Sequence, residues 1–207
     1  MAGRFTGFPR EAIDFFEGLA AHNNREWFQS HKDAYERACR EPMQDLIAEL
    51  EPQLGPSKVS RINRDIRFSK DKSPYKTRIS AGIGRYYISF SSAGLYVGTG
   101  MYKPEPATLA RLRSAIDNDA SGRKLQALVT SLRRKGYRVD THERLTSAPR
   151  GYSADHPRIE LLRMKDIFAG KQFEPEAWLS TRKALERIKR VMTDVAPLRD
   201  WLQRHVG

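Results

Sequence analysis

The sequence predicts an α+β protein in which an antiparallel sheet from the middle of the chain packs with N-terminal helices and a long C-terminal helix. Three observations support this fold class. Apolar residues recur every three or four positions before residue 56, apolar and polar residues alternate in several runs between residues 57 and 103, and the helical spacing returns after residue 104. A block of strands flanked by blocks of helices is typical of α+β proteins.

The chain has 207 residues, of which 39% are hydrophobic, and this is enough to bury a substantial core. We therefore expect a single domain over residues 1–207. It should comprise a helical N-terminal part (1–56), a sheet-rich core with a basic motif (57–103) and a mainly helical part (104–207).

The N-terminal part predicts three helices. Pro9 suits the first turn of a helix, and Asn24 is a suitable N-cap for a second. Trp27 and Tyr35 recur at helical spacing, and we expect both to be core residues beneath the basic motif. Pro42 starts or kinks a third helix that ends at the Gly-Pro pair after residue 54.

The spacing changes to an alternation typical of strands in the middle of the chain. Residues Val59 to Phe68 alternate in this way and predict a strand. The runs 86–90 and 95–100 are separated by a Ser-Ser-Ala-Gly sequence and predict a hairpin. These segments should form the antiparallel sheet.

Helical spacing returns around residues 109–116 and 125–132, and Gly136 should end the second of these helices. One more strand is expected at residues 137–139, and residues 140–157 have no clear period and predict a surface loop. A long final helix should bury a stripe of three residues at heptad spacing, and Pro197 should break or kink it. The stripe consists of Trp178, Leu185 and Met192.

Several classes of protein are excluded by what the sequence lacks. The only cysteine is Cys39, so an intrachain disulfide is excluded and a cytoplasmic location is expected. No apolar run approaches the roughly 20 residues of a membrane span, so no membrane partner is expected. The sequence has no dinucleotide-binding fingerprint, P-loop, zinc-binding His-Glu-x-x-His pattern or serine nucleophile elbow. We therefore expect no metal and no cofactor, and nothing in the sequence fixes an oligomeric state.

The net charge of +12 is unevenly distributed. Residues 1–57 carry a net charge of −4, whereas residues 58–207 carry +16. The highest density lies in residues 64–78, here called the basic segment, where six Lys or Arg residues and two Asp residues surround three large apolar residues. Such a concentration of cations attracts phosphates and carboxylates.

The basic segment supplies the candidate site residues. In an extended chain Asp65 and Arg67 share one face, so that the carboxylate can orient the guanidinium group toward an anion, or serve as a catalytic base. A turn stiffened by a proline follows and should hold the lysines in place. The candidate ligand-binding residues are Arg64, Arg67, Lys70, Lys72 and Lys76, and the candidate catalytic residue is Asp65. The first hypothesis is a binding or catalytic module for a small phosphate- or carboxylate-bearing ligand; no particular reaction is indicated.

Two alternatives use the same residues. The charges could form a structural ion-pair network that joins the sheet to the N-terminal helices through Asn23, Arg25 or Glu26, with a role in protein interaction. The second alternative is a nucleic-acid-binding protein, which would add further cations to form a surface that follows phosphates. Those cations are Arg111, Arg113, Lys124 and Arg133.

Three motifs resemble the uncharacterised family called Domain of Unknown Function 2461. They are residues 23–28 (Asn-Asn-Arg-Glu-Trp-Phe) with Tyr35 downstream, residues 63–76, and residues 98–106 (Gly-Thr-Gly-Met-Tyr-Lys-Pro-Glu-Pro). The resemblance spans nearly the whole chain. It implies a single cytoplasmic α+β domain whose hallmark is the Arg-Asp-x-Arg-Phe-Ser sequence of residues 64–69, and it implies nothing about a reaction.

Overall fold

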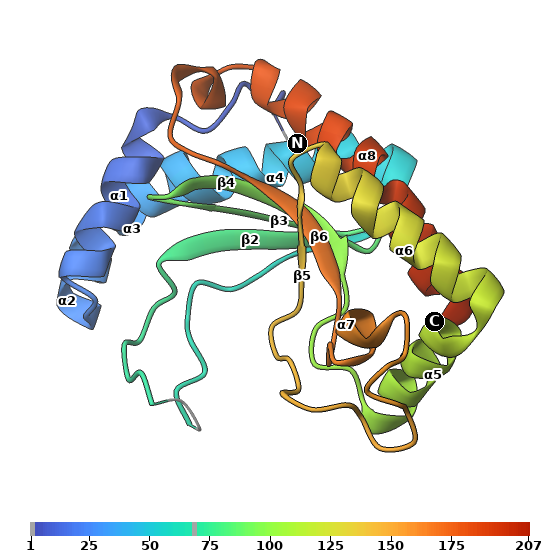
Figure 1. The fold of residues 1–207 in the computed structure, drawn as a ribbon. Coiled ribbons are helices and arrows are strands. Elements are labelled where there is room, and N and C mark those ends of the chain that lie inside the picture. Colours follow the sequence, from blue (N-terminus) through green and yellow to red (C-terminus); the bar gives the residue numbers. More distant parts are fainter. Residues whose placement is uncertain (1–2, 68–69) are drawn as a thin grey trace. The chain divides into compact units, whose positions relative to one another are not determined.

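The computed structural model describes residues 3–67 and 70–207, and its strands form a sheet in the order β1-β2-β3-β4-β6-β5 (Figure 1). The pairs β1–β2, β2–β3 and β5–β6 are antiparallel. The predicted α+β class, with an antiparallel sheet and a long C-terminal helix, is therefore confirmed. The strands are β1 (Ser57–Val59), β2 (Arg78–Ile83), β3 (Tyr86–Ser91), β4 (Gly94–Gly100), β5 (Arg138–Asp140) and β6 (Phe168–Phe173).

Helices precede β1, connect β4 to β5 and β5 to β6, and follow β6 to the end of the chain. They are α1 (Arg10–Ala21), α2 (Arg25–Ser30), α3 (Lys32–Tyr35), the π-helical turn η1 (Glu36–Arg40), α4 (Glu41–Leu54), α5 (Pro106–Asp117), α6 (Asp119–Arg134), α7 (Ile159–Leu162), the 3₁₀ turn η2 (Ala177–Ser180) and α8 (Lys183–His205). Within the described residues, no helix has the length and apolar composition to span a membrane.

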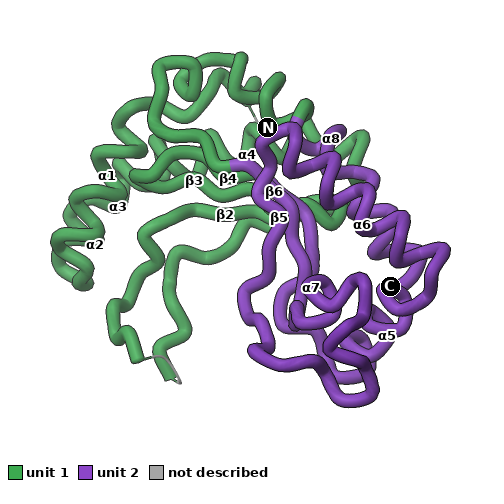
Figure 2. Tube along the Cα trace, in the orientation of Figure 1, with its two compact units in different colours: residues 1–97, 172–190 green, residues 98–171, 191–207 purple. Residues whose placement is uncertain are grey.

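The chain divides into two compact units (Figure 2). Unit 1 contains residues 1–97 and 172–190, and unit 2 contains residues 98–171 and 191–207. The chain therefore enters unit 2 within β4, returns to unit 1 within β6 and re-enters unit 2 within α8.

In unit 1 the helices cover one face of the sheet. Helix α4 packs against β2, and α1 packs against β3. Ile79, Ala81 and Ile83 of β2 are buried, and their register partners on β3 are also buried. Because side chains alternate along a strand, residues 78, 80 and 82 lie on the opposite face of β2.

The aromatic residues of the N-terminal helices only partly follow the prediction. Tyr35 is buried, as predicted, but Trp27 is half-buried, and Phe28 occupies the core instead. Asn24 caps α2 as predicted, accepting a hydrogen bond of 2.9 Å from the Trp27 N–H. Helix α2 ends at Ser30, and His31 has non-helical backbone angles. The rings of Trp27 and Tyr35 both lie 5.5 Å from that of Phe15 in α1, as an aromatic face packed on the first helix requires, but Trp27 remains half-buried.

Two prolines that were predicted to start, kink or break a helix both lie within helices. Pro42 lies in the first turn of α4, directly after the π-helical turn η1, so the third predicted helix is confirmed. Pro197 lies inside α8, which continues to His205, so the predicted break of the helix at this proline does not occur. Cys39 is fully buried within η1 and is a free thiol.

The predicted strand from Val59 to Phe68 is wrong. Strand β1 ends at Val59, and the chain leaves the sheet until β2 begins at Arg78; Phe68 lies outside the described residues. The alternation of apolar and polar residues arises in a hairpin-like loop with one isolated bridge, between Asn63 and Tyr75. The predicted hairpin of residues 86–100 is confirmed as β3 and β4.

In unit 2 the predicted helices and the strand near residue 138 are confirmed as α5, α6 and β5. Asn118 caps α6, and Gly136 adopts a left-handed conformation (φ 77°) after it. Residues 141–157 form no helix or extended strand, as predicted. Strand β6 was missed because the Ala-Gly-Lys-Gln sequence in its middle lacks the β-branched residues that mark strands.

The apolar stripe predicted for the final helix is buried. Leu185 lies in the unit 1 part of α8, and Met192 lies in the unit 2 part. Trp178 is also buried, but it lies in η2, before α8 begins at Lys183. The long helix therefore starts later than the spacing indicated.

Candidate functional site

The basic segment leaves the sheet between β1 and β2 as a loop that folds back on itself (Figure 1). Asn63 and Tyr75 form an antiparallel bridge across its base. Next to this bridge, the Arg64 N–H donates a 2.9 Å hydrogen bond to the Pro74 carbonyl. The two arms are therefore held together close to the sheet.

An asparagine from the N-terminal helices anchors this base. The Asn23 side-chain amide donates to the Tyr75 carbonyl (3.0 Å), and its oxygen accepts from the Tyr75 N–H (3.1 Å). The buried Tyr75 ring also stacks on Phe28, with ring centroids 4.1 Å apart. Of the three residues predicted as partners, Asn23 makes this contact, whereas Arg25 and Glu26 are exposed and make no ion pair within the described residues.

Arg64 is held inside the loop. Its guanidinium group pairs with the Asp71 carboxylate and donates a long hydrogen bond (3.4 Å) to the Tyr75 carbonyl. Its Nε atom is buried and has no hydrogen-bond partner within the described residues. Asp71 also accepts hydrogen bonds from the Ser73 hydroxyl and N–H. These bonds, and to a smaller extent Arg64, hold the pKa of the Asp71 carboxyl below its usual range.

Arg67 and Asp65 form a two-point ion pair. The Arg67 Nε and Nη2 atoms lie 3.0 and 2.7 Å from the two oxygens of Asp65, and the Arg67 N–H donates to the same carboxylate at 3.2 Å. These bonds hold the pKa of Asp65 below its usual range and raise that of Arg67. A carboxylate so engaged is a poor proton acceptor, so the geometry suits Asp65 as a group that orients Arg67 better than as a base.

Two of the three lysines of the basic segment are held by backbone carbonyls. Lys72 Nζ donates to the Ile66 carbonyl (3.0 Å), and Lys76 Nζ donates to the Arg61 carbonyl (2.8 Å). Lys70 is exposed. Both aspartates of the segment are bonded to arginines, and within the described residues none of these lysines has a carboxylate within ion-pair distance.

Lys76 lies among other cations. It is half-buried, and this burial is the largest cause of the lowered pKa of its ammonium group. Arg61, Arg78 and Arg64 lower this pKa further through charge repulsion. We call Arg61, Arg64, Lys76 and Arg78 the cationic cluster. Its members lie where the arms of the loop join the sheet, so that part of the predicted site is brought together by the fold.

A model of the family described as Conserved hypothetical protein (DUF2461) matches residues 11–201. The chain belongs to this family. The family predicted from the three sequence motifs is therefore confirmed, and the DUF2461 match includes the basic segment and the Asn23 anchor. Neither a curated protein nor a solved structure matches the chain.

The DUF2461 chain contains a second polar arrangement, in unit 2, that sequence reasoning missed. The Asp166 carboxylate, whose side chain is 3% exposed, accepts a 2.9 Å hydrogen bond from the Thr141 hydroxyl and another of 2.9 Å from the His142 N–H. Its second oxygen lies 3.0 Å from His142 Nδ1. Within the described residues the opposite ring atom, Nε2, has no hydrogen-bond partner, and the imidazole is 46% exposed.

The pairing of β5 with β6 explains this contact. Asp140 is the register partner of Phe168, so His142, two residues further on, faces Asp166, two residues earlier. No local motif announces the pair, because 24 residues separate its members. Only knowledge of the strand register would have revealed it.

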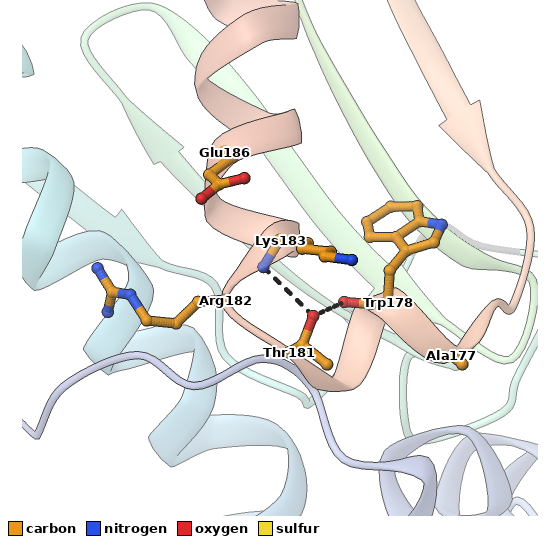
Figure 3. Close-up of a pocket in the computed structure, with 6 residues that line it drawn as sticks. All are labelled: Ala177, Trp178, Thr181, Arg182, Lys183 and Glu186. Atoms are coloured by element: carbon orange, nitrogen blue, oxygen red, sulfur yellow. Dashed lines mark hydrogen bonds between the residues drawn. The ribbon is translucent and has the colours of Figure 1, made fainter.

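Two cavities lie elsewhere in the DUF2461 chain. One, of about 400 Å³, is in unit 1 and is lined by Ala177, Trp178, Thr181, Arg182, Lys183 and Glu186 (Figure 3). The Thr181 hydroxyl there donates to the Trp178 carbonyl, and Arg182 is bonded to Glu49 and to the Phe5 carbonyl. These polar groups therefore serve the packing of unit 1. The other cavity, of about 450 Å³, lies beside α5 and α6 in unit 2.

Neither cavity contains a residue of the basic segment. Within the described residues, no group of three or more potential metal ligands lies together.

Proposed function

We propose that the protein binds a small phosphate- or carboxylate-bearing ligand at the basic segment. The observation that carries this proposal is the distribution of charge partners. Both aspartates of the segment are bonded to Arg64 and Arg67, whereas Lys72 and Lys76 are fixed by backbone carbonyls and have no carboxylate partner in the described part of the chain. An anion could therefore add to cations that are already positioned.

The cationic cluster supports the same proposal on electrostatic grounds. The charges of Arg61, Arg64 and Arg78 disfavour the charged form of Lys76. A bound phosphate would turn this repulsion into attraction and would form charge-assisted hydrogen bonds, which are about twice as strong as neutral ones. The Asn23 anchor and the stacked Tyr75 ring reduce the conformational freedom that binding would otherwise remove.

The contacts assigned to the ligand are Arg64, Arg67, Lys70, Lys72 and Lys76. Asp65 is assigned the role of orienting Arg67, because it already engages the guanidinium group at two points. A cytoplasmic setting fits such a ligand, since the protein would encounter phosphorylated metabolites there.

Calorimetric titration of the protein with inorganic phosphate and with ribose 5-phosphate tests the proposal. Lys76→Gln should weaken binding by about tenfold or more, because one charge-assisted contact is lost. Lys124→Gln, which removes an exposed lysine of α6, is the matched control and should bind as the parent does. Equal affinities for parent and Lys76→Gln would refute the assignment of Lys76.

The structural alternative makes a different prediction for the Arg67–Asp65 pair. If the pair binds a ligand, Arg67→Lys should weaken phosphate binding and leave the melting temperature nearly unchanged, because the pair is largely exposed to solvent. If instead Arg67→Lys and Asp65→Asn both lower the melting temperature by several degrees, and phosphate does not raise that of the parent, the segment is a structural network and the proposal fails.

Salt dependence separates the small ligand from a nucleic-acid surface. A surface that also used Arg111, Arg113, Lys124 and Arg133 would release many counterions, and its affinity would fall steeply with salt. A single phosphate on the cationic cluster would give a shallow slope. The fixed lysines and the anchored base favour the small ligand.

The His142–Asp166 pair favours a second candidate function, acid–base catalysis. A buried carboxylate that engages Nδ1 fixes the ring and leaves Nε2 to exchange a proton with a substrate or a water molecule. Hydrolysis of p-nitrophenyl phosphate and p-nitrophenyl acetate tests this candidate. His142→Gln should lose the activity, whereas His156→Gln should retain it, because both His156 nitrogens are already engaged. Equal rates for parent and His142→Gln would exclude the candidate.

A further inference from the structure

The sheet face of unit 1 that lies opposite the helices carries an exposed tyrosine beside a glycine. Tyr87 of β3 is the register partner of Gly82 of β2. Its neighbours Tyr86 and Ile88 are buried on the helix-covered face, whereas the Tyr87 side chain lies on the other face and is 38% exposed. Tyrosines are common on strands, so exposure alone does not indicate a binding role, and the surroundings of this ring are the relevant observation.

Space is available beside the Tyr87 ring. Gly82 is exposed, and a Cβ atom built on it would have its nearest neighbour, the Tyr86 carbonyl oxygen, 3.9 Å away. A side chain could therefore occupy this position without a clash, yet none is present. On the other side, Tyr96 of β4 contributes a second ring, with centroids 6.2 Å apart and planes inclined by 54°. Tyr87 thus has an aromatic neighbour on one side and a bare strand position on the other.

One member of the cationic cluster, Arg78, lies on the same sheet face. Arg78 and Gly82 are four residues apart on β2, so strand alternation places them on one face, and Arg78 is exposed. Lys76 and Arg61 adjoin Arg78, because the Lys76 ammonium group, two residues before Arg78 in the chain, donates a 2.8 Å hydrogen bond to the Arg61 carbonyl. Cations and an aromatic surface therefore flank one region of unit 1.

We propose that the ligand of the basic segment is a nucleotide, whose phosphate binds the cationic cluster and whose base stacks on Tyr87. This inference rests on the proposed function and specifies its ligand class. Every nucleobase has a π-face that stacks on aromatic rings, and an adjacent group of cations binds the phosphate. A simple carboxylate or sugar phosphate would make no use of the ring.

A ligand series measures the contribution of the base directly. The parent protein should bind adenosine 5′-monophosphate about tenfold or more tightly than ribose 5-phosphate, which carries the same phosphate without the base. Tyr87→Ala should remove this difference while retaining affinity for ribose 5-phosphate. Tyr87→Phe keeps the ring and should retain the difference. Tyr102→Ala, which removes a tyrosine of unit 2 that is 66% exposed, is the control and should behave as the parent.

The outcomes separate the two proposals. If the parent binds ribose 5-phosphate and adenosine 5′-monophosphate equally well, the nucleotide inference is overturned and the proposed function remains. If neither inorganic phosphate nor ribose 5-phosphate binds, the proposed function fails and the inference fails with it. A thymidine hexanucleotide distinguishes the source of the nucleotide. Tighter, strongly salt-dependent binding of the hexanucleotide than of thymidine monophosphate would identify a single strand, and equal binding would identify a free nucleotide.

Discussion

Replacing Asn23 with alanine should loosen the base of the basic segment. The Asn23 amide makes two hydrogen bonds to the backbone of Tyr75, of 3.0 and 3.1 Å, and Tyr75 is 5% exposed. Each such bond contributes about 0.5–1.5 kcal/mol net. Burial of Tyr75 increases the expected loss of stability, because a buried backbone group without a partner is costly. The long hydrogen bond from Arg64 to the Tyr75 carbonyl reduces it, because the carbonyl keeps one partner. We expect a loss of about 2 kcal/mol in the free energy of unfolding.

Urea denaturation and thermal melts measure this loss. For a chain of 207 residues, 2 kcal/mol corresponds to a fall in melting temperature of about 4–8 °C. Asn24→Ala is a closely matched control, because Asn24 caps α2 and makes no hydrogen bond to the basic segment within the described residues. It should lose about 1 kcal/mol, the usual cost of removing an N-cap.

The two variants should differ most in ligand binding. Asn23→Ala should weaken phosphate binding, because the cations of the segment lose part of their preorganisation, whereas Asn24→Ala should bind phosphate as the parent does. An Asn23→Ala protein with parental stability and parental phosphate affinity would refute the reasoning that the anchor positions the site.

Three further predictions concern stability and reactivity. Gly122→Ala should lower the free energy of unfolding by about 1–3 kcal/mol or more in urea titrations, because the new Cβ would collide with the Ile116 carbonyl oxygen and lie 2.5 Å from the Nε atom of the buried Arg158. Hydrogen bonds from Arg182 hold the pKa of Glu49 below its usual range in the folded protein. These bonds therefore stabilise the fold fully above roughly pH 4.3, the pKa of glutamate in an unfolded chain. The stabilisation is lost as the pH falls through the lower pKa of Glu49 in the folded protein. Glu49→Gln should therefore flatten the acid limb of the stability curve; an unchanged limb would contradict this. Burial raises the pKa of the Cys39 thiol, so it should react with a disulfide reagent far more slowly in the native than in the unfolded protein, and equal rates would show that it is accessible.

Local chemistry was predicted well from the sequence. Asn24 and Pro42 lie at helix starts and Gly136 follows a helix end, because capping and backbone restrictions depend on neighbouring residues alone. The errors occurred where a distant partner decides the structure. Trp27 was predicted for the core from its spacing, but it is only half-buried on α1, and the adjacent Phe28 is buried against Tyr75.

The candidate site shows the same division. The family, the fold class and the concentration of cations in residues 64–78 could all be predicted before the structure, because each depends on residue identity and local order. Which charged groups pair with one another could not be predicted in this way. Asp71 pairs with Arg64 because the loop folds back, and His142 meets Asp166 because β5 and β6 are in register. Such contacts depend on strand pairing and loop closure between residues far apart in the chain, which local propensities do not encode.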